Sequence, residues 1–492
     1  MADALDTKVA ETEVEKQEYA ENASVRRAAP PAIDPEVNRR LLRKIDWRLM
    51  PVLCVTYALQ FWDKAMLGQA AVFGLREDLK LTHGSSFSWV SLILYFGHIA
   101  GMYPFSWLAQ RYHPKRVCST MTIVWAVIVL TTPACTTYSG ILANRFFLGF
   151  VEAGISPVFM LVIALWYTHP EQVLRSSIWY SFSGGSNIIS PLVNFGLAHI
   201  IGGGRAPWQY MYFFAGGITL LWGIALIWIF PDVPQEARGF SAEEKRLLLE
   251  RVRVNNAGSE NTHVKFYQIT EALMEYQFWG IFVLAMLSCT GSAVVVQFAS
   301  IVFNGMGFDK YTSLLLNLPT GGMAFLCVIG SGYCGRNFKN ARFHLITIGC
   351  LPVILGTSLV WQLTNEQRAG RVVGFYLINF FSFVWVQCIG LGTSNIAGHT
   401  KRTIYASGTF IGYSLGNVIG SLLFDAKFGP RYDESFTGIT VCFAVCCVLG
   451  EVIRFLLARE NKRRDTKYGP PEWSHGLEDL TDRENKSFRY TL

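Results

Sequence analysis

The chain alternates between long apolar segments and shorter polar ones. About 20 mostly apolar residues are needed to cross a bilayer as a helix. The clearest polar interruption, residues 231–276, contains Ser241 and Glu244 at the spacing of a capping box, which predicts that a short surface helix begins there. Twelve segments, six on each side of this interruption, meet the length requirement: 49–73, 87–109, 117–135, 139–165, 176–201, 208–230, 277–303, 312–334, 343–363, 372–394, 403–424 and 436–458.

Composition supports the same interpretation. Of the 492 residues, 51% are hydrophobic and only 16% are charged, whereas soluble domains carry about 25% charged residues. We therefore predict an all-α integral membrane protein with twelve transmembrane helices in two six-helix halves. The predicted parts are a disordered cytosolic tail at 1–45, a first half at 46–230, a cytosolic central loop with a surface helix at 231–276, a second half at 277–458 and a cytosolic tail at 459–492.

Charged residues set the expected orientation. Lys and Arg gather before the first apolar segment, in the central interruption and after the last segment, and clusters of this kind are typical of cytosolic loops. Both termini should therefore be cytosolic in a multi-pass protein, and we expect the plasma membrane. The net charge of +7 arises from these clusters and does not indicate a nucleic-acid partner. The eleven cysteines lie in or beside apolar segments without metal-site spacing, so we expect neither disulfides nor a bound metal.

Two short basic loops occupy the same place in each predicted half. LAQRYHPKR (108–116) follows the second apolar segment, and YCGRNFKNAR (333–342) follows the eighth. Duplicated halves are typical of secondary transporters. LAQRYHPKR resembles the loop signature of the major facilitator superfamily, although Gln110 stands where an Asp is usual. The resemblance implies that the basic residues of the two loops take part in gating: Arg111, Lys115, Arg116 and Arg336.

Longer stretches resemble the fungal allantoate permease family, within the anion:cation symporter branch of that superfamily. The resemblance implies a major facilitator fold. It also implies proton-coupled import of a small organic anion, such as allantoate, ureidosuccinate, nicotinate or another carboxylate or vitamin. The matching stretches, in family order, are YALQFWDK (57–64), FGLREDLKL (73–81), RFFLGFVEAGISP (145–157), WYTHPEQVLRSSIWY (166–180) and FPDVPQEARGFSAEEKR (230–246).

The first apolar segment contains two adjacent charged residues near its middle. A charge at the centre of a membrane helix costs about 2.5–3.5 kcal/mol on insertion scales. On a helical wheel, Gln60, Asp63 and Lys64 share about one third of the circumference with Thr56 and Tyr57. This polar arc predicts a face toward protein or water, with Lys64 and Gln60 as candidate substrate-binding residues and Asp63 as a candidate proton carrier. The alternative is a structural pair that locks the first helix to a neighbour.

The fourth apolar segment repeats this arrangement. Arg145 and Glu152 fall on one face but two turns apart, roughly 10 Å along the axis, which is too far for a direct ion pair in a straight helix. Arginine suits bidentate capture of a carboxylate, so Arg145 is the candidate anion anchor. Glu152, which we expect to be buried away from cations, is the second candidate proton carrier. Each residue has a structural alternative: a salt-bridged or interfacial Arg145, and a Glu152 hydrogen-bonded to a neighbouring helix.

Neutral polar residues and glycines complete the candidate set. Asn187 in the fifth segment and Gln297 in the seventh are candidate substrate contacts, although such amides also simply join helices. From the superfamily resemblance, we expect the glycine stripes of the second and eleventh segments to meet at the interface between the halves and to slide there, with ordinary tight packing as the alternative. The glycines of these stripes recur every four residues, a spacing that lets helices approach closely: Gly97 and Gly101, then Gly408, Gly412 and Gly416.

Motifs for chemistry other than transport are missing from the sequence. It contains no GxxxxGK[ST] phosphate loop, no HExxH zinc motif and no nucleophile elbow. We therefore expect no enzyme activity and no cofactor, with a proton gradient as the energy source. The leading hypothesis is a monomeric proton-coupled symporter that imports a small organic anion by alternating access, with substrate, protons and the lipid bilayer as partners. The alternatives are an exporter or intracellular-membrane carrier of a fungal secondary metabolite on the same fold, and a non-transporting nutrient receptor.

Overall fold

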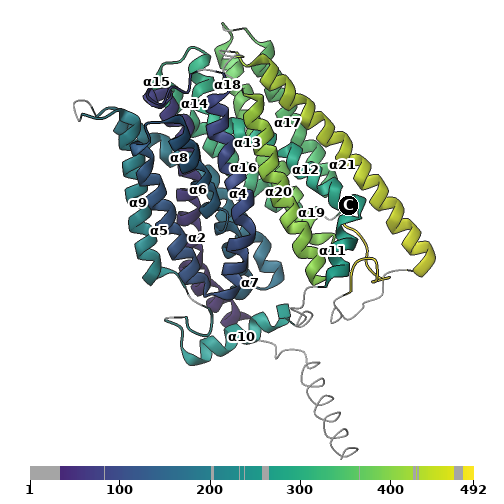
Figure 1. Ribbon diagram of the computed structural model, residues 1–492. Coiled ribbons are helices and arrows are strands. Elements are labelled where there is room, and N and C mark those ends of the chain that lie inside the picture. The colour runs from purple at the N-terminus through teal and green to yellow at the C-terminus, as the bar shows by residue number, and fades with distance from the viewer. Residues whose placement is uncertain are drawn as a thin grey trace, which may run out of the picture.

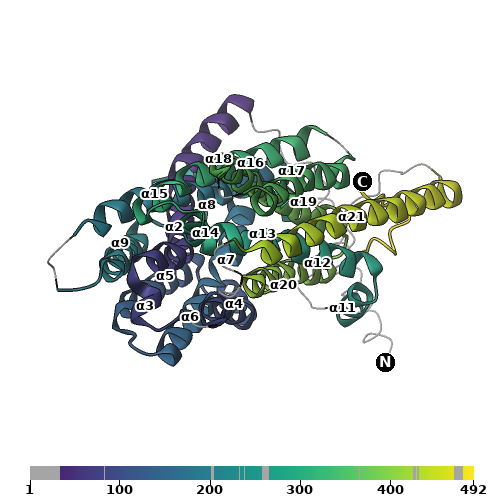
Figure 2. The ribbon, with the colours of Figure 1, turned by 90° about the horizontal axis from the view of Figure 1, so that it is seen from above.

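In the computed structural model, the described residues are 34–492 apart from 83, 201–203, 232, 238, 257–264, 339, 365, 425–427, 429–430 and 470–479. Every regular element in these ranges is a helix, which confirms the all-α class. Figure 1 shows the long helices running alongside one another, and Figure 2 looks down on the same bundle from above. We call the end where α2 (Pro35–Ala70) begins and α21 (Asp433–Tyr468) ends the tail end of the bundle.

The first half of the chain supplies α2 to α9. α2 continues into a π-helical turn, η1, and two consecutive helices, α6 and α7, make one long apolar crossing. The bounds after α2 are η1 (Ala71–Leu75), α3 (Arg76–Asp78), α4 (Ser86–Arg111), α5 (Pro114–Thr131), η2 (Thr132–Ala134), α6 (Tyr138–Glu152), α7 (Ile155–Trp166), α8 (His169–Ala198) and α9 (Pro207–Ile229).

The linker and the second half follow with more interruptions. α10 (Ala242–Asn256) and α11 (Phe266–Leu273) belong to the linker. The helices of the second half that precede α21 are α12 (Tyr276–Ser288), α13 (Thr290–Ala293), η3 (Val294–Phe298), α14 (Ala299–Gly305), α15 (Lys310–Leu315), α16 (Asn317–Asn337), α17 (Arg342–Gln362), α18 (Arg368–Leu377), η4 (Ile378–Phe380), α19 (Phe381–Ser394) and α20 (His399–Leu423).

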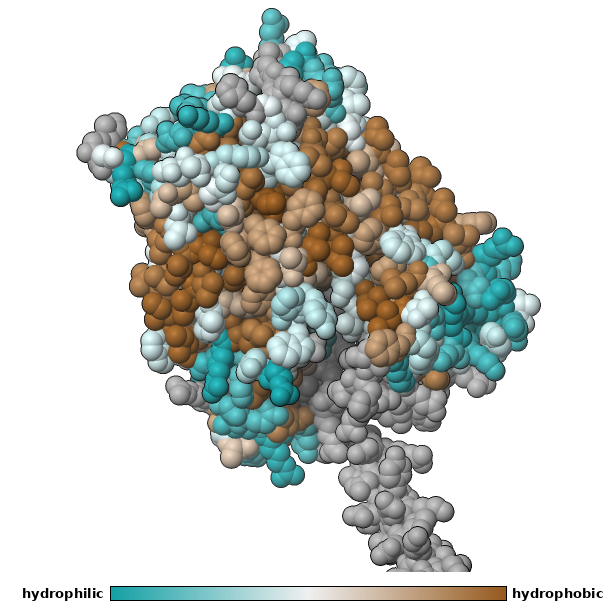
Figure 3. All heavy atoms as spheres, viewed as in Figure 1, coloured by the Kyte–Doolittle hydropathy of each residue, from teal (hydrophilic) through white to brown (hydrophobic). Residues whose placement is uncertain are grey.

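Apolar side chains cover the middle of the bundle on the face seen in Figure 3. Within the described ranges, nine helical stretches are long and apolar enough to cross a membrane. α2, α8 and α20 are the other long helices that the prediction requires, and they complete its twelve crossings. Figure 3 shows the apolar band between two hydrophilic ends. Because soluble proteins rarely expose apolar surface on this scale, the band identifies a multi-pass membrane protein.

Local sequence explains where two helices begin. Asp34 accepts a hydrogen bond from the Glu36 N–H (3.0 Å), and Pro35 occupies the first helical position, where its missing N–H leaves nothing unsatisfied. α2 therefore begins before the predicted boundary at residue 46. The predicted surface helix is α10, and its capping box forms as expected: the Ser241 N–H donates to Glu244 (2.8 Å) and the Glu244 N–H donates to Ser241 (3.1 Å).

The helices that carry the glycine stripes, α4 and α20, do pack against each other across the two halves. The stripes themselves face helices of their own half, so the prediction that the stripes form the interface between the halves is wrong. A Cβ on Gly97 would lie 2.1 Å from the carbonyl oxygen of Phe146 in α6, and a Cβ on Gly416 would lie 2.2 Å from that of Met286 in α12. These positions leave no room for a side chain, which lets α4 pack on α6 and α20 pack on α12. The other members of the stripes face the same partners: Gly101 faces α6, and Gly408 and Gly412 face α12.

The halves meet through other glycines. A Cβ on Gly184 in α8 would lie 2.6 Å from the carbonyl oxygen of Gly321 in α16. A Cβ on Gly68 in α2 would lie 2.0 Å from the carbonyl oxygen of Gln297 in η3. Since α2 and α8 precede the linker and η3 and α16 follow it, these two crossings hold the first half directly against the second.

Aromatic side chains join the halves at the end opposite the tail end. Tyr311, at the start of α15, packs against Phe73 in η1 (ring centroids 5.5 Å apart) and against His199 just after α8 (4.4 Å). The Ser88 hydroxyl in α4 donates to the carbonyl oxygen of Phe424, directly after α20. The bundle is therefore closed at this end by contacts between the two halves.

The last residues of the chain fold back onto the second half at the tail end. Arg464 in α21 donates to the backbone carbonyl of Asp482 (2.7 Å). Asn395, directly after α19, exchanges two hydrogen bonds with the backbone of Thr491 (3.0 and 2.7 Å). These contacts join residues far apart in sequence, so residues 480–492 form part of the folded second half.

A buried lysine anchors this docked segment. The Lys401 side chain is 0% exposed, and its Nζ lies 2.9 Å from Glu271, 2.7 Å from Glu275 and 2.6 Å from Asp482. The three carboxylates are close enough together to hold a metal ion. The Lys401 ammonium already occupies that position, so the cluster is a buried salt-bridge network and not a metal site.

Candidate functional site

The polar arc of α2 lies in the interior of the bundle. The side chains of Gln60, Asp63 and Lys64 are at most 4% exposed. Residues three and four apart share a helix face, so these three side chains point the same way, toward α5 and α6. The arc is thus where the helical wheel places it, and its charges contact protein groups of the first half.

The central ion pair joins Lys64 to Glu152. Lys64 Nζ lies 3.4 Å from Glu152 Oε2, so the expectation that Glu152 is buried away from cations is wrong. Both carboxylate oxygens of Glu152 lack a hydrogen-bond donor among the described residues. The Lys64 ammonium is therefore the nearest compensation for a carboxylate whose side chain is 0% exposed.

An interruption of the fourth crossing brings a backbone group into this cluster. α6 ends at Glu152 and α7 begins at Ile155. Pro157 has no N–H for the carbonyl of Ala153, four residues earlier, which weakens the helix at this point. Gln60 Nε2 donates to the carbonyl oxygen of Glu152 at the interruption (3.2 Å). Gln60 thus binds the same residue as its neighbour on the arc, Lys64.

Asp63 is held by a tryptophan from the third crossing. Trp125 Nε1, in α5, donates to Asp63 Oδ2 (2.6 Å). The other carboxylate oxygen, Oδ1, has no hydrogen-bond partner in the described part of the chain. Asp63 is also close enough to Arg145 and Glu152 to interact with both electrostatically. One oxygen of this carboxylate is therefore fixed, while the other is available to a proton or a ligand.

Arg145 is fully buried in α6 and binds a tyrosine of α9. Its Nη2 donates to the Tyr212 hydroxyl, and its guanidinium carbon lies 5.3 Å from the centre of the Tyr212 ring. Nε and Nη1 have no hydrogen-bond partner among the described residues. As the spacing predicts, the direct partner of Arg145 is not Glu152. A buried guanidinium with unused donors is suited to a planar anion such as a carboxylate.

The second half contributes Gln297 to the same region. Gln297 lies in the π-helical turn η3, and such turns occur often at functional sites. Its Nε2 donates to the hydroxyl of Tyr95 in α4 (3.0 Å), while its Oε1 has no hydrogen-bond partner in the described chain. Tyr95 in turn is close enough to Glu152 to interact with it electrostatically. Gln297 thus connects the second half to the charged cluster.

Aromatic rings from both halves surround these groups. Tyr57 on the polar arc packs edge-on against Trp179 of α8 (centroids 4.6 Å apart). Tyr413 of α20 packs against Trp385 of α19 (5.1 Å). Tyr180 contacts both Tyr57 and Trp385, and so joins the two sets of rings. The charged cluster and the aromatic side chains form one buried site, to which α2, α4, α5, α6, α8, α9, η3, α19 and α20 contribute.

The remaining candidate residues lie elsewhere. Asn187 is at the tight crossing of α8 with α16, where a Cβ on Gly321 would be 2.7 Å from its backbone. Arg111 ends α4, and Lys115 and Arg116 lie in the first turn of α5, so only residues 112 and 113 separate the two helices and most of the predicted loop is helical. The side chains of Gln110 and Arg336 are outside the described residues. The structure therefore brings together six of the candidates for substrate and proton, which are Gln60, Asp63, Lys64, Arg145, Glu152 and Gln297.

Sequence reasoning missed the neutral partners of the charges. Trp125 holds Asp63, and Tyr212 holds Arg145. In the sequence, neither aromatic residue differs from the many others in the apolar segments. A buried carboxylate or guanidinium requires hydrogen-bond partners, which would have directed attention to the tryptophans and tyrosines of neighbouring segments. This requirement would not have identified which tryptophan or tyrosine binds each charged group.

Comparisons with known proteins agree with this arrangement. The Major Facilitator Superfamily matches residues 53–403. An uncharacterized transporter of Schizosaccharomyces pombe is 33% identical over 465 residues, which cover 94% of this chain and 91% of the relative. Allantoate permease of Saccharomyces cerevisiae is 32% identical over 477 residues, which cover 94% and 88%.

A solved structure supports the fold. The proton:xylose symporter XylE bound to 6-bromo-6-deoxy-D-glucose matches with a TM-score of 0.64 at 13% identity, covering 87% of this chain and 96% of that one. At this identity the likeness shows the fold alone. Together with the twelve helical crossings and the buried charged site, the matches show that this chain is a membrane transporter, not an enzyme, and that it belongs to the Major Facilitator Superfamily, in the group that includes allantoate permease.

Proposed function

We propose that the protein is a proton-coupled symporter that imports a small organic anion by alternating access. The observation that carries the proposal is the state of Arg145, a fully buried guanidinium with two unpartnered nitrogens among the described residues. Intramembrane charges are functional candidates because they are costly to insert. A ligand carboxylate would satisfy the unused donors with charge-assisted hydrogen bonds. Allantoate permease, a relative named for an organic anion, supports this class of substrate.

The ion pair between Lys64 and Glu152 supports a mechanism for coupling. When Glu152 binds a proton, its negative charge disappears and Lys64 becomes free to join Arg145 in holding the anion. When the proton leaves, Lys64 returns to Glu152 and the anion loses one of its two cations. Proton and substrate therefore favour each other's binding, and thermodynamic linkage makes this effect reciprocal. Asp63, with one unpartnered oxygen, is the alternative proton carrier.

The distribution of contacts supports an inward-facing arrangement. Tyr311 and Ser88 join the halves at the end opposite the tail end. The described ion pairs near the tail end instead stay within one half and the linker, as for Arg175 with Asp46 (2.8 Å) and Lys44 with Glu244 (2.6 Å). We infer that the tail end faces the cytosol, as the Lys and Arg clusters predict. The protein then acts as a monomer in the plasma membrane, with the proton gradient as its energy source and no cofactor.

The test is flux into proteoliposomes that contain the purified protein. Radiolabelled allantoate, ureidosuccinate, nicotinate and pantothenate are offered with an inward proton gradient. We expect at least one of them to accumulate above its external concentration and to leave again when a protonophore is added. Accumulation that persists with the protonophore would contradict proton coupling. Binding without flux would favour the nutrient receptor, and efflux driven by an opposite gradient alone would favour the exporter.

A further inference from the structure

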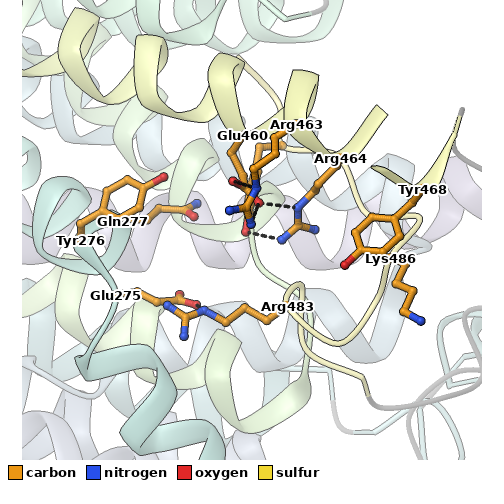
Figure 4. A pocket seen from close by; sticks show the side chains of 10 residues that line it. Glu275, Tyr276, Gln277, Glu460, Arg463, Arg464, Tyr468, Arg483 and Lys486 are labelled. Atoms are coloured by element: carbon orange, nitrogen blue, oxygen red, sulfur yellow. Dashed lines mark hydrogen bonds and ion pairs between the residues drawn. The ribbon is translucent and has the colours of Figure 1, made fainter. Parts of the chain in front are cut away.

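A cavity of about 400 Å³ lies at the tail end of the second half, away from the transport site. Three segments form its walls: the start of α12, the last turns of α21 and the docked residues that follow position 480. Figure 4 shows their side chains meeting around it. The lining residues are Glu275, Tyr276, Gln277, Glu460, Arg463, Arg464, Tyr468, Arg483, Lys486 and Tyr490.

The lining is basic, and its acidic residues are already paired. Four lining side chains are cationic and two are carboxylates. Glu460 accepts from both Arg463 (3.0 Å) and Arg464 (3.1 Å). Glu275 pairs with Arg483 (2.8 Å), in addition to the buried lysine at position 401. Two positive charges of the lining are therefore unbalanced, which favours an anionic occupant.

The unbalanced charge is accessible. Lys486 has no ion-pair partner among the described residues, and its Nζ lies 5.8 Å from the centre of the Tyr468 ring. The Arg463 side chain is 74% exposed although it contacts Glu460. An arginine fork, an ammonium and the phenol hydroxyls of Tyr276 and Tyr468 around one cavity are donors that match the oxygens of a phosphate group.

The surroundings of the cavity place it at the membrane surface. Tyr276 and Trp279, in the first turn of α12, are 51% and 50% exposed. Phe266 and Met274, at the two ends of α11, are 80% and 76% exposed. Tyrosine and tryptophan are enriched at the level of the lipid head groups, and basic pockets at such positions bind anionic head groups.

We propose that this cavity binds a phosphate-bearing anion, and that the head group of an anionic phospholipid is the source. The bound phosphate would be held by Arg463 from α21 and Lys486 from the docked segment, and so would tie these two segments together. This site is independent of the transport mechanism, because it shares no residue with the cluster around Arg145.

The experiment is a ligand titration of the full-length protein in detergent, read as the midpoint of thermal unfolding. The probes are short-chain phosphatidylinositol bisphosphate, short-chain phosphatidylcholine, inositol trisphosphate and inorganic phosphate. We expect the anionic lipid to raise the midpoint and phosphatidylcholine to leave it unchanged, because a ligand that binds only the folded state stabilises it. If inositol trisphosphate raises the midpoint as much as the anionic lipid does, the site binds a soluble phosphate compound and not a lipid head group.

Two double variants make the test specific. Arg463→Ala with Lys486→Ala removes two exposed cations that line the cavity, whereas Lys462→Ala with Lys467→Ala removes two exposed cations of α21 that do not line it. The first pair of substitutions should weaken the apparent affinity for the anionic lipid by about tenfold or more. The second pair should weaken it by less than about twofold. Matching midpoints without ligand show that both variants are folded. Equal weakening by the two pairs, or no response to any phosphate-bearing probe, would overturn the proposal.

Discussion

Replacing Lys64 with Met removes the cation from the buried ion pair while keeping an unbranched side chain. The two partners are 4% and 0% exposed, so the Glu152 carboxylate would be left without compensation in the interior. Breaking a buried pair by removing one partner costs about 3–5 kcal/mol. We expect Lys64→Met to lower the free energy of unfolding by about 3 kcal/mol at neutral pH. The loss should shrink in acid, because a protonated Glu152 needs no cation.

The assay is denaturant unfolding of the protein in micelles, followed by tryptophan fluorescence. Adding Glu152→Gln to Lys64→Met should recover at least half of the loss, since the uncompensated charge is then gone. Lys44→Met is the matched control on the same helix. Lys44 and its partner Glu244 are 34% and 30% exposed, and exposed pairs contribute below about 1 kcal/mol. Equal losses for Lys64→Met and Lys44→Met would refute the reasoning.

Three further results are expected. Arg145→Lys keeps the charge but loses the planar fork, so the KM for the anion should rise about tenfold or more in uptake assays, and an unchanged KM would exclude the anchor role. Gly149→Ala places a Cβ 1.9 Å from the Leu94 carbonyl oxygen and should lower the free energy of unfolding by about 1–3 kcal/mol; Gly196→Ala, with open space around it, should not. The hydrogen bond from Lys44 lowers the pKa of Glu244 below 4.5. The stabilisation that this hydrogen bond provides is therefore present at neutral pH and lost as pH falls through that lowered pKa. In Glu244→Gln, the free energy of unfolding should consequently fall less steeply as the solution is made acidic.

Periodic features of the chain were predictable from sequence. The helical wheel placed Gln60, Asp63 and Lys64 on one buried face because three- and four-residue spacing fixes direction within a helix. The capping box at Ser241 was predictable for the same reason, since it depends on two residues only three positions apart. Nine of the twelve crossings are long and apolar enough to be predicted from these properties alone, and α2, α8 and α20 are the less apolar helices that complete the set.

Partner choice was not predictable, because it depends on which helices become neighbours. The glycine stripe of α4 shows that something packs closely there, but Gly97 does not specify that the neighbour is α6. Glu152 was expected to lack a cation, and only the folded arrangement brings the Lys64 side chain of α2 within 3.4 Å of it. The polar composition of residues 480–492 suggests a solvated tail, yet Asp482 binds the buried Lys401 from a position far away in sequence.

The measurement that tests the central claim most directly is a comparison of two fluxes in Glu152→Gln. The substitution imitates a permanently protonated carboxyl, so Lys64 stays free and the substrate still binds. We predict that exchange of labelled for unlabelled anion across the proteoliposome membrane persists in this variant, while accumulation driven by a proton gradient is lost. Accumulation that matches the unmodified protein would contradict the account, because Glu152 would then not carry the coupled proton.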